Sequence, residues 1–333
     1  MSDGGTRTRA DGRAESGAGI GGADTGAGIA QVIREAGAGA GRAPGIREAG
    51  ASDAAAIAAV AGAALTLDTA QAPALVERLL NPPRERRWTA LVTEDLDGVV
   101  FASLSAHEET AGHIDLLAVA PGSRGRGRGR GRALVAAAED WLRGQGAAEA
   151  RLAGNPPCYA WPGVDVRYTP AACLAERLGY ERYGIAWNMT VDLTADLSVE
   201  ADLVRLAARG VTVHRVGQAD RDAVSAFVRE HWSDNWAWEA EQATGCHYAS
   251  RDGEILGFAA WGARPAWFGP MGTAPAARGL GVGRVLLRRC LAEQRAAGMA
   301  STQISWVGPL GFYSRAVGAR AERVFWRYRR SLR

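Results

Sequence analysis

The chain has 333 residues, of which 47% are hydrophobic, and its 39 basic and 36 acidic side chains leave a formal net charge of +3. This length allows two domains with separate cores. The near balance of charge argues against a surface built throughout for nucleic acid. The four cysteines lie far apart and without metal-ligand spacing, so we expect a reducing compartment, no disulfide framework and no metal site.

The start of the chain shows no targeting signal and little capacity to fold. No basic stretch followed by an apolar core opens the sequence, and the longest apolar run, 54–67, is too short to span a membrane. Residues 1–44 are mainly Gly, Ala, Arg and small polar residues, without an aromatic residue. Such a segment buries too little apolar surface to fold, so we predict a disordered arm on a cytoplasmic protein with no membrane contact.

The first half, 45–193, has the pattern of one α/β domain. The motif IREAGA occurs at 33–38 and at 46–51, and only the second copy precedes a helix-forming run, so it predicts the first strand. The runs WTALVTED and VVFASLSA flank LDG and predict a hairpin. A third strand, GHIDLLAVAP, leads into an arginine–glycine stretch and an amphipathic helix.

The second half, 211–333, repeats this order of elements. It contains a hairpin that turns at Asp252-Gly253, the strand AWFGPMGT, a glycine-rich turn and a long helix. The two glycine-rich turns lie roughly 150 residues apart, at the same place in each half, which indicates a tandem repeat of one α/β unit. Residues 194–210 are expected to form a partly helical linker.

The glycine-rich turn of the second half is suited to binding phosphate. It joins a predicted strand to a predicted helix, where glycines let backbone N–H groups approach a ligand and the helix N-terminus favours negative charge. For one such copy alone, a tight turn without a ligand is the alternative explanation. The candidate binding residues are Arg278, Gly279, Leu280, Gly281, Val282, Gly283 and Arg284.

The arginine–glycine stretch of the first half fits the same motif in two registers. Counted from the preceding proline, the motif falls on Arg124, Gly127 and Gly129. Counted back from the helix, it falls on Arg126, Gly129 and Gly131, which we favour because donors at the helix start converge on a phosphate. A nucleic-acid-binding arm would need a free segment, whereas this one is fixed between a strand and a helix. The candidate binding residues are Arg126, Gly127, Arg128, Gly129, Arg130 and Gly131.

The R-x-x-G-x-G spacing after a strand resembles the pyrophosphate-binding turn of the GNAT superfamily of acyl-CoA-dependent N-acetyltransferases. The resemblance extends over 45–333, and VGPLGFYSRAVGA at 307–319 is similar to the family's helix after the fifth strand. It implies an α/β fold of two tandem GNAT-like domains, each a mixed, mostly antiparallel sheet flanked by helices, with acetyl-CoA as cosubstrate. It also implies that Tyr313 is the general acid for the departing thiolate, a role that suits a phenol. A packed core tyrosine is the alternative.

The two halves differ at this tyrosine. Ala175 or Leu174 takes its place in the first half, where Tyr159 and Tyr168 could substitute. We therefore expect the C-terminal half to carry the chemistry, and the N-terminal half either to bind acetyl-CoA or to be structural.

In this family the strand before the turn separates from its neighbour, and its backbone binds pantetheine and the thioester oxygen. The resemblance assigns these roles to Met271, Gly272 and Thr273 in the second half and to Leu117, Ala118 and Val119 in the first. A backbone N–H near Met271 would stabilise the tetrahedral oxyanion.

The general base is not defined by the sequence. The strand 266–273 carries no carboxylate, whereas the equivalent strand of the first half carries Asp115. The candidates in the second half are Glu230, His231, Asp234, Glu239 and Glu241, with a bound water as the alternative. Three tryptophans lie among these residues and either line an acceptor pocket or form a packed helix face: Trp232, Trp236 and Trp238.

These observations predict an acetyl-CoA-dependent N-acetyltransferase, in which a primary amine of a small molecule or peptide attacks the thioester directly. The alternative is a non-catalytic acyl-CoA sensor or interaction module formed by two decayed copies. Two observations favour this alternative. The first half has no tyrosine at the position that matches Tyr313, and the strand 266–273 of the second half has no carboxylate. The sequence identifies neither the acceptor nor an oligomeric state, since acceptor pockets are built from variable loops.

Overall fold

The computed structural model describes residues 45–82, 85–106, 108, 110–125, 129–157, 159–264 and 266–333. The predicted disordered arm, 1–44, lies outside these residues, as do Arg126, Gly127 and Arg128 of the arginine–glycine stretch.

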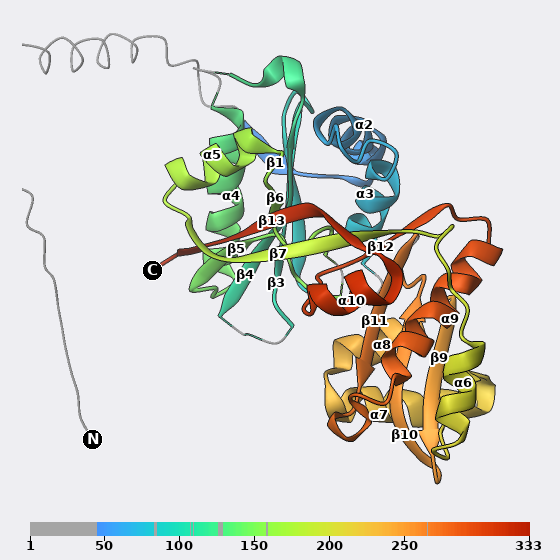
Figure 1. Cartoon of the computed structure of the whole chain (residues 1–333). Helices are drawn as coiled ribbons and strands as arrows, with labels where there is room; N and C mark the ends of the chain where they lie inside the picture. Colours follow the sequence, from blue (N-terminus) through green and yellow to red (C-terminus); the bar gives the residue numbers. More distant parts are fainter. Residues whose placement is uncertain are drawn as a thin grey trace, which may run out of the picture. The chain divides into compact units, whose positions relative to one another are not determined.

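The first half folds in the predicted order of elements (Figure 1). Its second IREAGA copy contains the first strand, and the predicted hairpin around LDG is formed, with Val92 opposite Val99. In chain order the elements are β1 (Ile46–Glu48), α2 (Ala54–Ala64), α3 (Ala72–Leu80), β2 (Trp88–Thr93), β3 (Gly98–Leu104), β4 (Ala111–Val119), α4 (Arg130–Gly144), β5 (Glu149–Leu152), β6 (Val164–Asp165), α5 (Thr169–Arg177) and β7 (Glu181–Asp192).

The second half repeats this order after the helix α6 (Glu200–Ala207), which lies in the predicted linker. Its hairpin turns at Asp252-Gly253, with Arg251 opposite Glu254. The remaining elements are β8 (Thr212–Arg215), α7 (Arg221–His231), α8 (Asp234–Glu241), β9 (Gly245–Arg251), β10 (Glu254–Trp261), β11 (Trp267–Thr273), α9 (Val282–Ala296), β12 (Ser301–Ile304), α10 (Leu310–Val317) and β13 (Arg320–Ser331).

One continuous sheet joins the two halves. Its strand order is β1-β2-β3-β4-β5-β13-β7-β12-β11-β10-β9-β8, and β6 pairs with β13 beside this path. The pairs β4–β5 and β11–β12 are parallel, whereas the other described pairs are antiparallel. This arrangement is the mixed, mostly antiparallel sheet that the sequence predicts.

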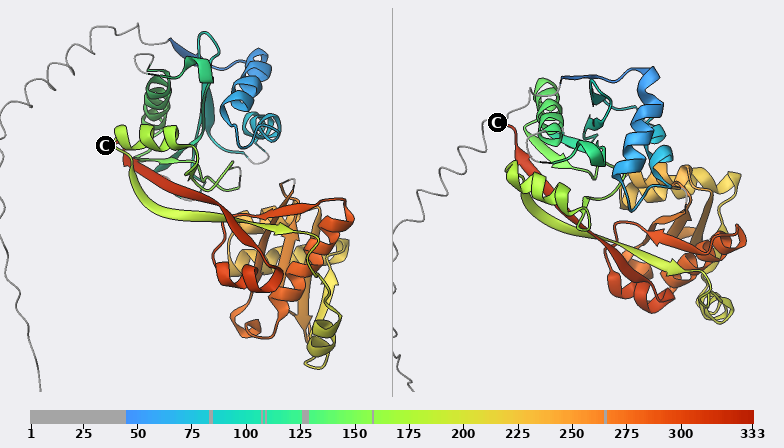
Figure 2. Two further views of the ribbon diagram at one scale, coloured as in Figure 1. Left: turned by 45° about the horizontal axis from the view of Figure 1, so that its top comes forward. Right: turned by 90° about the horizontal axis from the view of Figure 1, so that it is seen from above.

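The last strand of each half completes the sheet of the other half. The long strands β7 and β13 pair with each other from Glu181–Arg329 to Thr190–Arg320 and lie side by side in both views of Figure 2. Beyond this shared ribbon, β13 pairs with β5, while β7 pairs with β12. Segments from both halves of the chain are therefore needed to build either half of the sheet, which the sequence did not predict.

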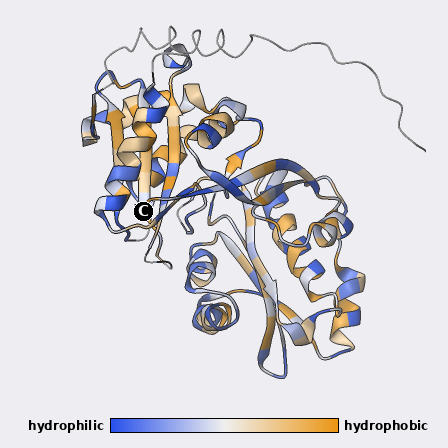
Figure 3. Cartoon of the chain, turned by 90° about the vertical axis from the view of Figure 1, so that its left-hand side faces the viewer, coloured by the Kyte–Doolittle hydropathy of each residue, from blue (hydrophilic) through white to orange (hydrophobic). Residues whose placement is uncertain are grey.

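Helices cover both faces of each half. In the first half, α2 and α3 enclose one apolar cluster with the sheet, and α4 and α5 enclose another. In the second half, α7 and α8 cover one face and α9 covers the other. Hydrophobic residues accordingly run along the strands in Figure 3, and all seven residues of β3 are buried. Burial on both faces fixes the strands and so fixes the loops at their ends.

Candidate functional site

The N-terminal half contains a cavity of about 710 Å³. It opens between β4 and β5 and is bounded by the glycine-rich turn, the start of α4, the helix α5 and the loop that contains Trp161. This volume is within the usual range for small-molecule and cofactor sites.

The cavity exists because two parallel strands separate. Strands β4 and β5 pair over four positions only, from Ala111–Glu149 to Ile114–Leu152, and no pair follows beyond Ile114. The backbone of β4 beyond this point borders the cavity through Asp115, Leu116, Leu117 and Val119. In the second half, β11 and β12 separate in the same way after Phe268–Ile304.

Both glycine-rich turns end in a glycine that caps the following helix. Gly129 precedes α4 with φ 61°, and Gly281 precedes α9 with φ 94°, a left-handed conformation that favours glycine. The two helix starts therefore match Gly129 to Gly281, as in the register counted back from the helix. The short 3₁₀ turns before them begin at Pro121 and Pro275, so the extra dipeptide of the first half lies between the prolines and the caps.

The cavity mouth is rich in arginine. Arg124, Arg130, Arg132 and Arg177 line it, together with Gly125, Gly129 and Gly131. Arg130 is engaged by Asp95 and Asp97 at 3.0 and 2.8 Å, whereas Arg132 forms no ion pair with the described residues. Arg124 donates to the backbone carbonyls of Val119 and Ala64, which leaves its charge without a carboxylate partner there. Positive charge and free helix-start donors thus lie together.

The predicted binding residues of the first half lie at this cavity with one exception among those described. Leu117, Val119, Gly129, Arg130 and Gly131 line it. Ala118 instead points into the apolar cluster beneath α2 and α3. Because side chains alternate along a strand, only its backbone can face the gap.

Asp115, like Asp165, is a buried carboxylate of the cavity wall. Its side chain is 1% exposed, and its Oδ2 accepts a hydrogen bond from Ser103 Oγ at 2.6 Å. Asn155 in turn donates to Ser103 Oγ at 2.8 Å, and Arg86 Nη2 lies 3.5 Å from Asp115 Oδ2. The other oxygen, Oδ1, is buried and has no hydrogen-bond partner among the described residues.

The backbone explains why this carboxylate faces the cavity. Phe101 of β3 pairs with Leu116 and Ala102 pairs with Ile114, so Asp115 is the extra residue of a β-bulge, a feature that redirects a side chain. Burial raises the pKa of Asp115 to about 6, while nearby Arg86 and the Ser103 hydrogen bond act against this rise. A carboxylate with this pKa is ionised at pH 7 and is a stronger base than an ordinary aspartate.

The corresponding strand of the second half has no such group. Counted from Pro121 and Pro275, Asp115 matches Gly269, and Leu116 matches Pro270, which has no backbone N–H. Met271, Leu280 and Phe312 pack against the apolar cluster beneath α9. Of these side chains, Met271 and Phe312 lie beside Gly283 at the start of α9.

Some of the predicted binding residues around α9 have open space beside them, whereas others are packed against neighbouring side chains. A Cβ on Gly279 or Gly281 would meet no atom within 4 Å, so the outside of the turn is open. A Cβ on Gly283 would lie 3.4 Å from Phe312 Cζ and 3.6 Å from Met271 Cε, and a Cβ on Gly272 would overlap the Trp232 ring. Val282 is fully buried in the same cluster.

Arg284 and Thr273, which the sequence predicts to bind the cofactor, contact other residues of the protein. Arg284 donates to both oxygens of Asp202 on α6, at 2.9 and 2.6 Å. Thr273 borders the packed glycines, with its Cγ2 atom 3.5 Å from a Cβ on Gly283. Arg278 forms no ion pair with the described residues.

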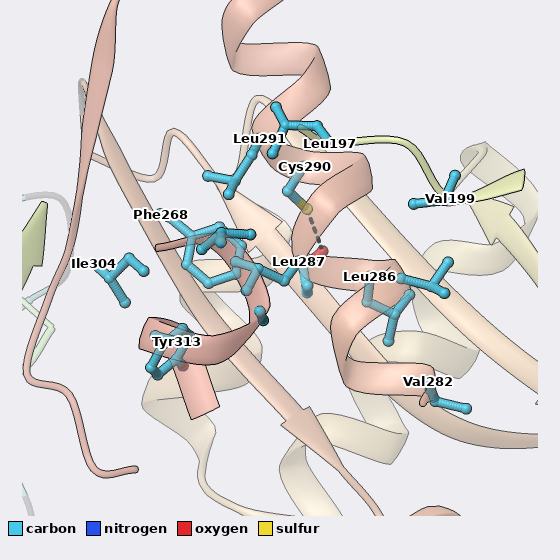
Figure 4. Packing of buried hydrophobic residues seen from close by; sticks show 14 of the residues in the cluster. Leu197, Val199, Phe268, Val282, Leu286, Leu287, Cys290, Leu291, Ile304 and Tyr313 are labelled. Carbon is cyan, nitrogen blue, oxygen red and sulfur yellow. Dashed lines mark hydrogen bonds between the residues drawn. The ribbon is translucent and has the colours of Figure 1, made fainter. Parts of the chain in front are cut away.

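Tyr313 lies in the core of the second half. It is 8% exposed, with its ring centroid 4.9 Å from Phe312 and 6.4 Å from Phe268. Figure 4 shows it among Phe268, Ile304 and the leucines of α9. Burial raises the pKa of Tyr313 to about 12. Its role as general acid is a prediction that this packing does not favour.

The two tyrosines that could substitute in the first half lie at different places. Tyr168 lines the cavity, and its hydroxyl donates to Asp68 Oδ2 at 3.0 Å. Tyr159 is buried where the halves meet, with its hydroxyl 3.2 Å from Ser305 Oγ and its ring 5.4 Å from that of Trp306. Burial and the Asp68 charge raise the pKa of Tyr168 above its usual range.

The candidate bases of the second half lie outside this cavity. Glu230, His231, Asp234 and Glu241 are exposed, and Arg229 pairs with Asp234 at 2.8 Å. Burial raises the pKa of Glu239 to about 7, with Arg264 and Arg78 opposing the rise.

The packed-face interpretation holds for two of the three tryptophans. Trp232 and Trp236 stack with centroids 5.9 Å apart and pack on Phe258. Their rings thus belong to the apolar cluster beneath α7 and α8.

The described part of the chain contains neither a metal-binding cluster nor a membrane-spanning helix. No group of three or more His, Cys, Asp or Glu side chains there could hold a metal ion. No described helix is long and apolar enough to cross a membrane.

Comparison with known proteins identifies the family. The model of the acetyltransferase (GNAT) family matches twice, at residues 64–160 and 216–317, and the chain belongs to this family. It therefore consists of two tandem GNAT repeats of an acyltransferase family. A search of the curated proteins found no match.

Solved structures share the fold at low sequence identity. A GCN5-related N-acetyltransferase from Sphaerobacter thermophilus has a TM-score of 0.64 and 21% identity over 86% of this chain and 95% of its own. A tandem GNAT protein from the clavulanic acid biosynthesis pathway, solved without AcCoA, has a TM-score of 0.65 and 18% identity over 87% and 98%.

A third structure is much longer than this chain. It is a GCN5-related glucosamine N-acetyltransferase region in a fungal multi-domain GH3 beta-N-acetylglucosaminidase, with a TM-score of 0.72 and 18% identity. The match covers 86% of this chain but only 38% of that one.

Proposed function

We propose that the protein is an acetyl-CoA-dependent N-acetyltransferase whose reaction takes place in the N-terminal cavity. The observation that carries this proposal is a buried carboxylate, Asp115, on the wall of a cavity between separated strands, with a glycine-rich helix start at its mouth. This assignment differs from the sequence-based expectation, which gave the chemistry to the C-terminal half.

The cavity has the features that acetyl-CoA requires. Helix-start donors at Gly129 and Gly131 and the charges of Arg124 and Arg132 suit the phosphates. The apolar wall between them and Asp115 includes Leu117 and suits the pantetheine arm. Backbone groups of β4 that have lost their β5 partners are available to bind amide and thioester oxygens.

Asp115 is assigned the role of general base. It accepts a proton from the attacking amine, directly or through a bound water, while the nitrogen forms a bond to the thioester carbonyl carbon. A β4 backbone N–H near Leu117 stabilises the negative charge on the carbonyl oxygen. The bond between carbon and sulfur then breaks, and the thiolate leaves and takes up a proton. Ser103 and Asn155 hold the carboxylate in place throughout.

The C-terminal half supports this site structurally in our proposal. Packing by Met271, Phe312 and Trp232 around β11 is the observation that favours this role. The sequence-based prediction of Tyr313 as general acid is the competing assignment. A cytoplasmic location and an amine acceptor, either a small molecule or a peptide, belong to the same proposal.

Release of free CoA thiol tests the proposal. Wild-type protein with acetyl-CoA is assayed against a panel of amino acids, polyamines, aminoglycosides, amino sugars and peptides, and we expect amine-dependent release. Calorimetry measures acetyl-CoA binding in parallel. Binding without thiol release from any amine would support a non-catalytic sensor instead.

A further inference from the structure

A buried arginine from the last strand of the chain holds part of the N-terminal cavity wall. Arg323 of β13 is 6% exposed and bonds two carboxylates of the first half. Its Nη1 and Nη2 donate to Asp68 Oδ1 and Oδ2 at 2.6 and 3.0 Å, and its Nε donates to Asp165 Oδ2 at 2.8 Å. A planar guanidinium makes such paired bonds in a fixed geometry that lysine cannot reproduce.

Both carboxylates are connected to the cavity. Asp165 lines it directly, and Asp68 accepts the hydrogen bond from Tyr168, which also lines it. The Tyr168 hydroxyl accepts in turn from the backbone N–H of Leu67 at 3.1 Å. Trp161 lines the cavity as well, and the Arg323 guanidinium lies 5.4 Å from its ring centroid. One residue thus fixes Asp165, Tyr168 and Trp161 relative to one another.

Arg323 balances the negative charges of Asp68 and Asp165. Asp165 has a second partner in Arg167 at 2.8 Å, but Asp68 forms an ion pair with no described residue other than Arg323. Buried charges are tolerated when they are paired and hydrogen-bonded. Any shift of Arg323 therefore moves Asp68 and, through it, Tyr168.

The chemistry of this wall differs from that of the mouth. Arginines and glycines at the mouth suit phosphates, whereas the phenol of Tyr168 and the indole of Trp161 suit an amine-bearing acceptor.

We propose that Arg323 is a positioning residue for acyl transfer, which holds the acceptor-binding wall of the N-terminal cavity. The site in the first half is then completed by the last strand of the second half, which gives the exchange of β7 and β13 a functional consequence. This inference rests on the proposed function.

The test compares Arg323→Lys with Arg320→Lys in the full chain. Arg320 lies three residues away on the same strand, but it is exposed and pairs with Glu322 at the surface. With acetyl-CoA and the best amine of the panel, we expect Arg323→Lys to raise the KM for the amine, and kcat/KM to fall up to about 10²-fold as expected for a misplaced binding group. The acetyl-CoA Kd and the Arg320→Lys kinetics are expected to match wild type.

A purely structural role would have a different signature. It would lower the melting temperature and the fraction of active protein, and would leave the KM for the amine unchanged. Tyr168→Phe removes one hydroxyl and its hydrogen bond to Asp68 but leaves the Arg323–Asp68 ion pair in place, so it tests the same wall if Arg323→Lys fails to fold. We expect it to raise the KM for the amine too.

The outcomes separate the two proposals. Suppose that the wild type is active and that Tyr168→Phe and folded Arg323→Lys both have the wild-type KM for the amine. This result would overturn the inference about Arg323 and leave the proposed function standing. A wild type that binds acetyl-CoA but transfers to no amine would overturn the proposed function and this inference together.

Discussion

The two glycine-rich turns have the same backbone conformation, but the residues around them differ. Both begin with a proline-led 3₁₀ turn and end in a left-handed glycine that caps a 15-residue helix. In the first half Arg132 lines the cavity and forms no ion pair with a described residue, whereas its counterpart Arg284 is paired with Asp202 of α6. The first half carries Asp115 at the bulge of this strand, whereas the second half has Gly269 and Pro270 between the paired residues Phe268 and Met271. A phosphate-binding motif therefore indicates a site only together with the residues that surround it.

Removal of the Asp115 carboxylate, which the second half lacks, is expected to have the largest effect on acetyl transfer. Asp115→Asn should lower kcat/KM for acetyl transfer about 10²–10⁴-fold, the usual contribution of a general base, and leave acetyl-CoA binding intact. Steady-state thiol release measures the rate. The control is Asp140→Asn, an exposed carboxylate on α4. Equal losses in the two variants would argue against the assigned base.

The pH dependence of the wild type tests the same residue. Burial raises the pKa of Asp115 to about 6. Protonation removes the base, so we expect kcat/KM to fall as the pH drops through about 6, and to be constant above it until other groups titrate. A wild-type profile that stays flat between pH 5 and about 7 would contradict this role.

Substitution of the matched cap glycines distinguishes the two turns. Gly129 and Gly281 both have positive φ and open space around a Cβ, so aspartate, which tolerates this conformation better than most residues, strains both alike. We expect Gly129→Asp to weaken acetyl-CoA binding by about tenfold or more, or ~1.4 kcal/mol, through repulsion of the phosphates. Gly281→Asp is expected to bind like wild type. Calorimetry that finds the reverse order would move the site to the second half.

A smaller difference is expected between the two matched arginines. Arg132→Gln should weaken acetyl-CoA binding several-fold, because it removes one positive charge from the cavity lining. Arg284→Gln should leave this affinity unchanged and lower the free energy of unfolding by about 1 kcal/mol, because it breaks the Asp202 pair. Calorimetry and thermal melts measure the two effects. A weaker Kd in Arg284→Gln alone would contradict the assignment.

The smallest effect is expected at Tyr313. Its ring packs in the C-terminal core, away from the cavity residues, so Tyr313→Phe should retain acetyl transfer close to the wild-type rate. The competing assignment as general acid expects a loss of about 10²-fold or more. Thiol release by the purified variant decides between them.

The repeat and most elements follow from local sequence patterns. The hairpins around LDG and Asp252-Gly253 and the two glycine turns depend on residues close together in the chain, so the sequence predicts them. The exchange of β7 and β13 depends on pairing between residues far apart in the chain, such as Ile185 with Trp326, for which one sequence contains no signal.

The site that we propose lies in the other half from the one that the sequence favoured, for a similar physical reason. The motif around Tyr313 is a local resemblance, whereas the room for a ligand depends on the side chains that fill the gap between strands. Met271 and Phe312 pack beside Gly283 at the start of α9 in one half, whereas Leu117 and Leu174 line the cavity of about 710 Å³ in the other. The sequence did contain one usable signal, since Asp115 is the carboxylate that the matching strand of the second half lacks.

A crystal structure with acetyl-CoA tests the central claim most directly. We expect the diphosphate at the start of α4, near Gly129 and Arg132, and the thioester carbonyl beside Asp115 in the gap between β4 and β5. Acetyl-CoA bound instead at the start of α9, with its sulfur next to Tyr313, would contradict the account.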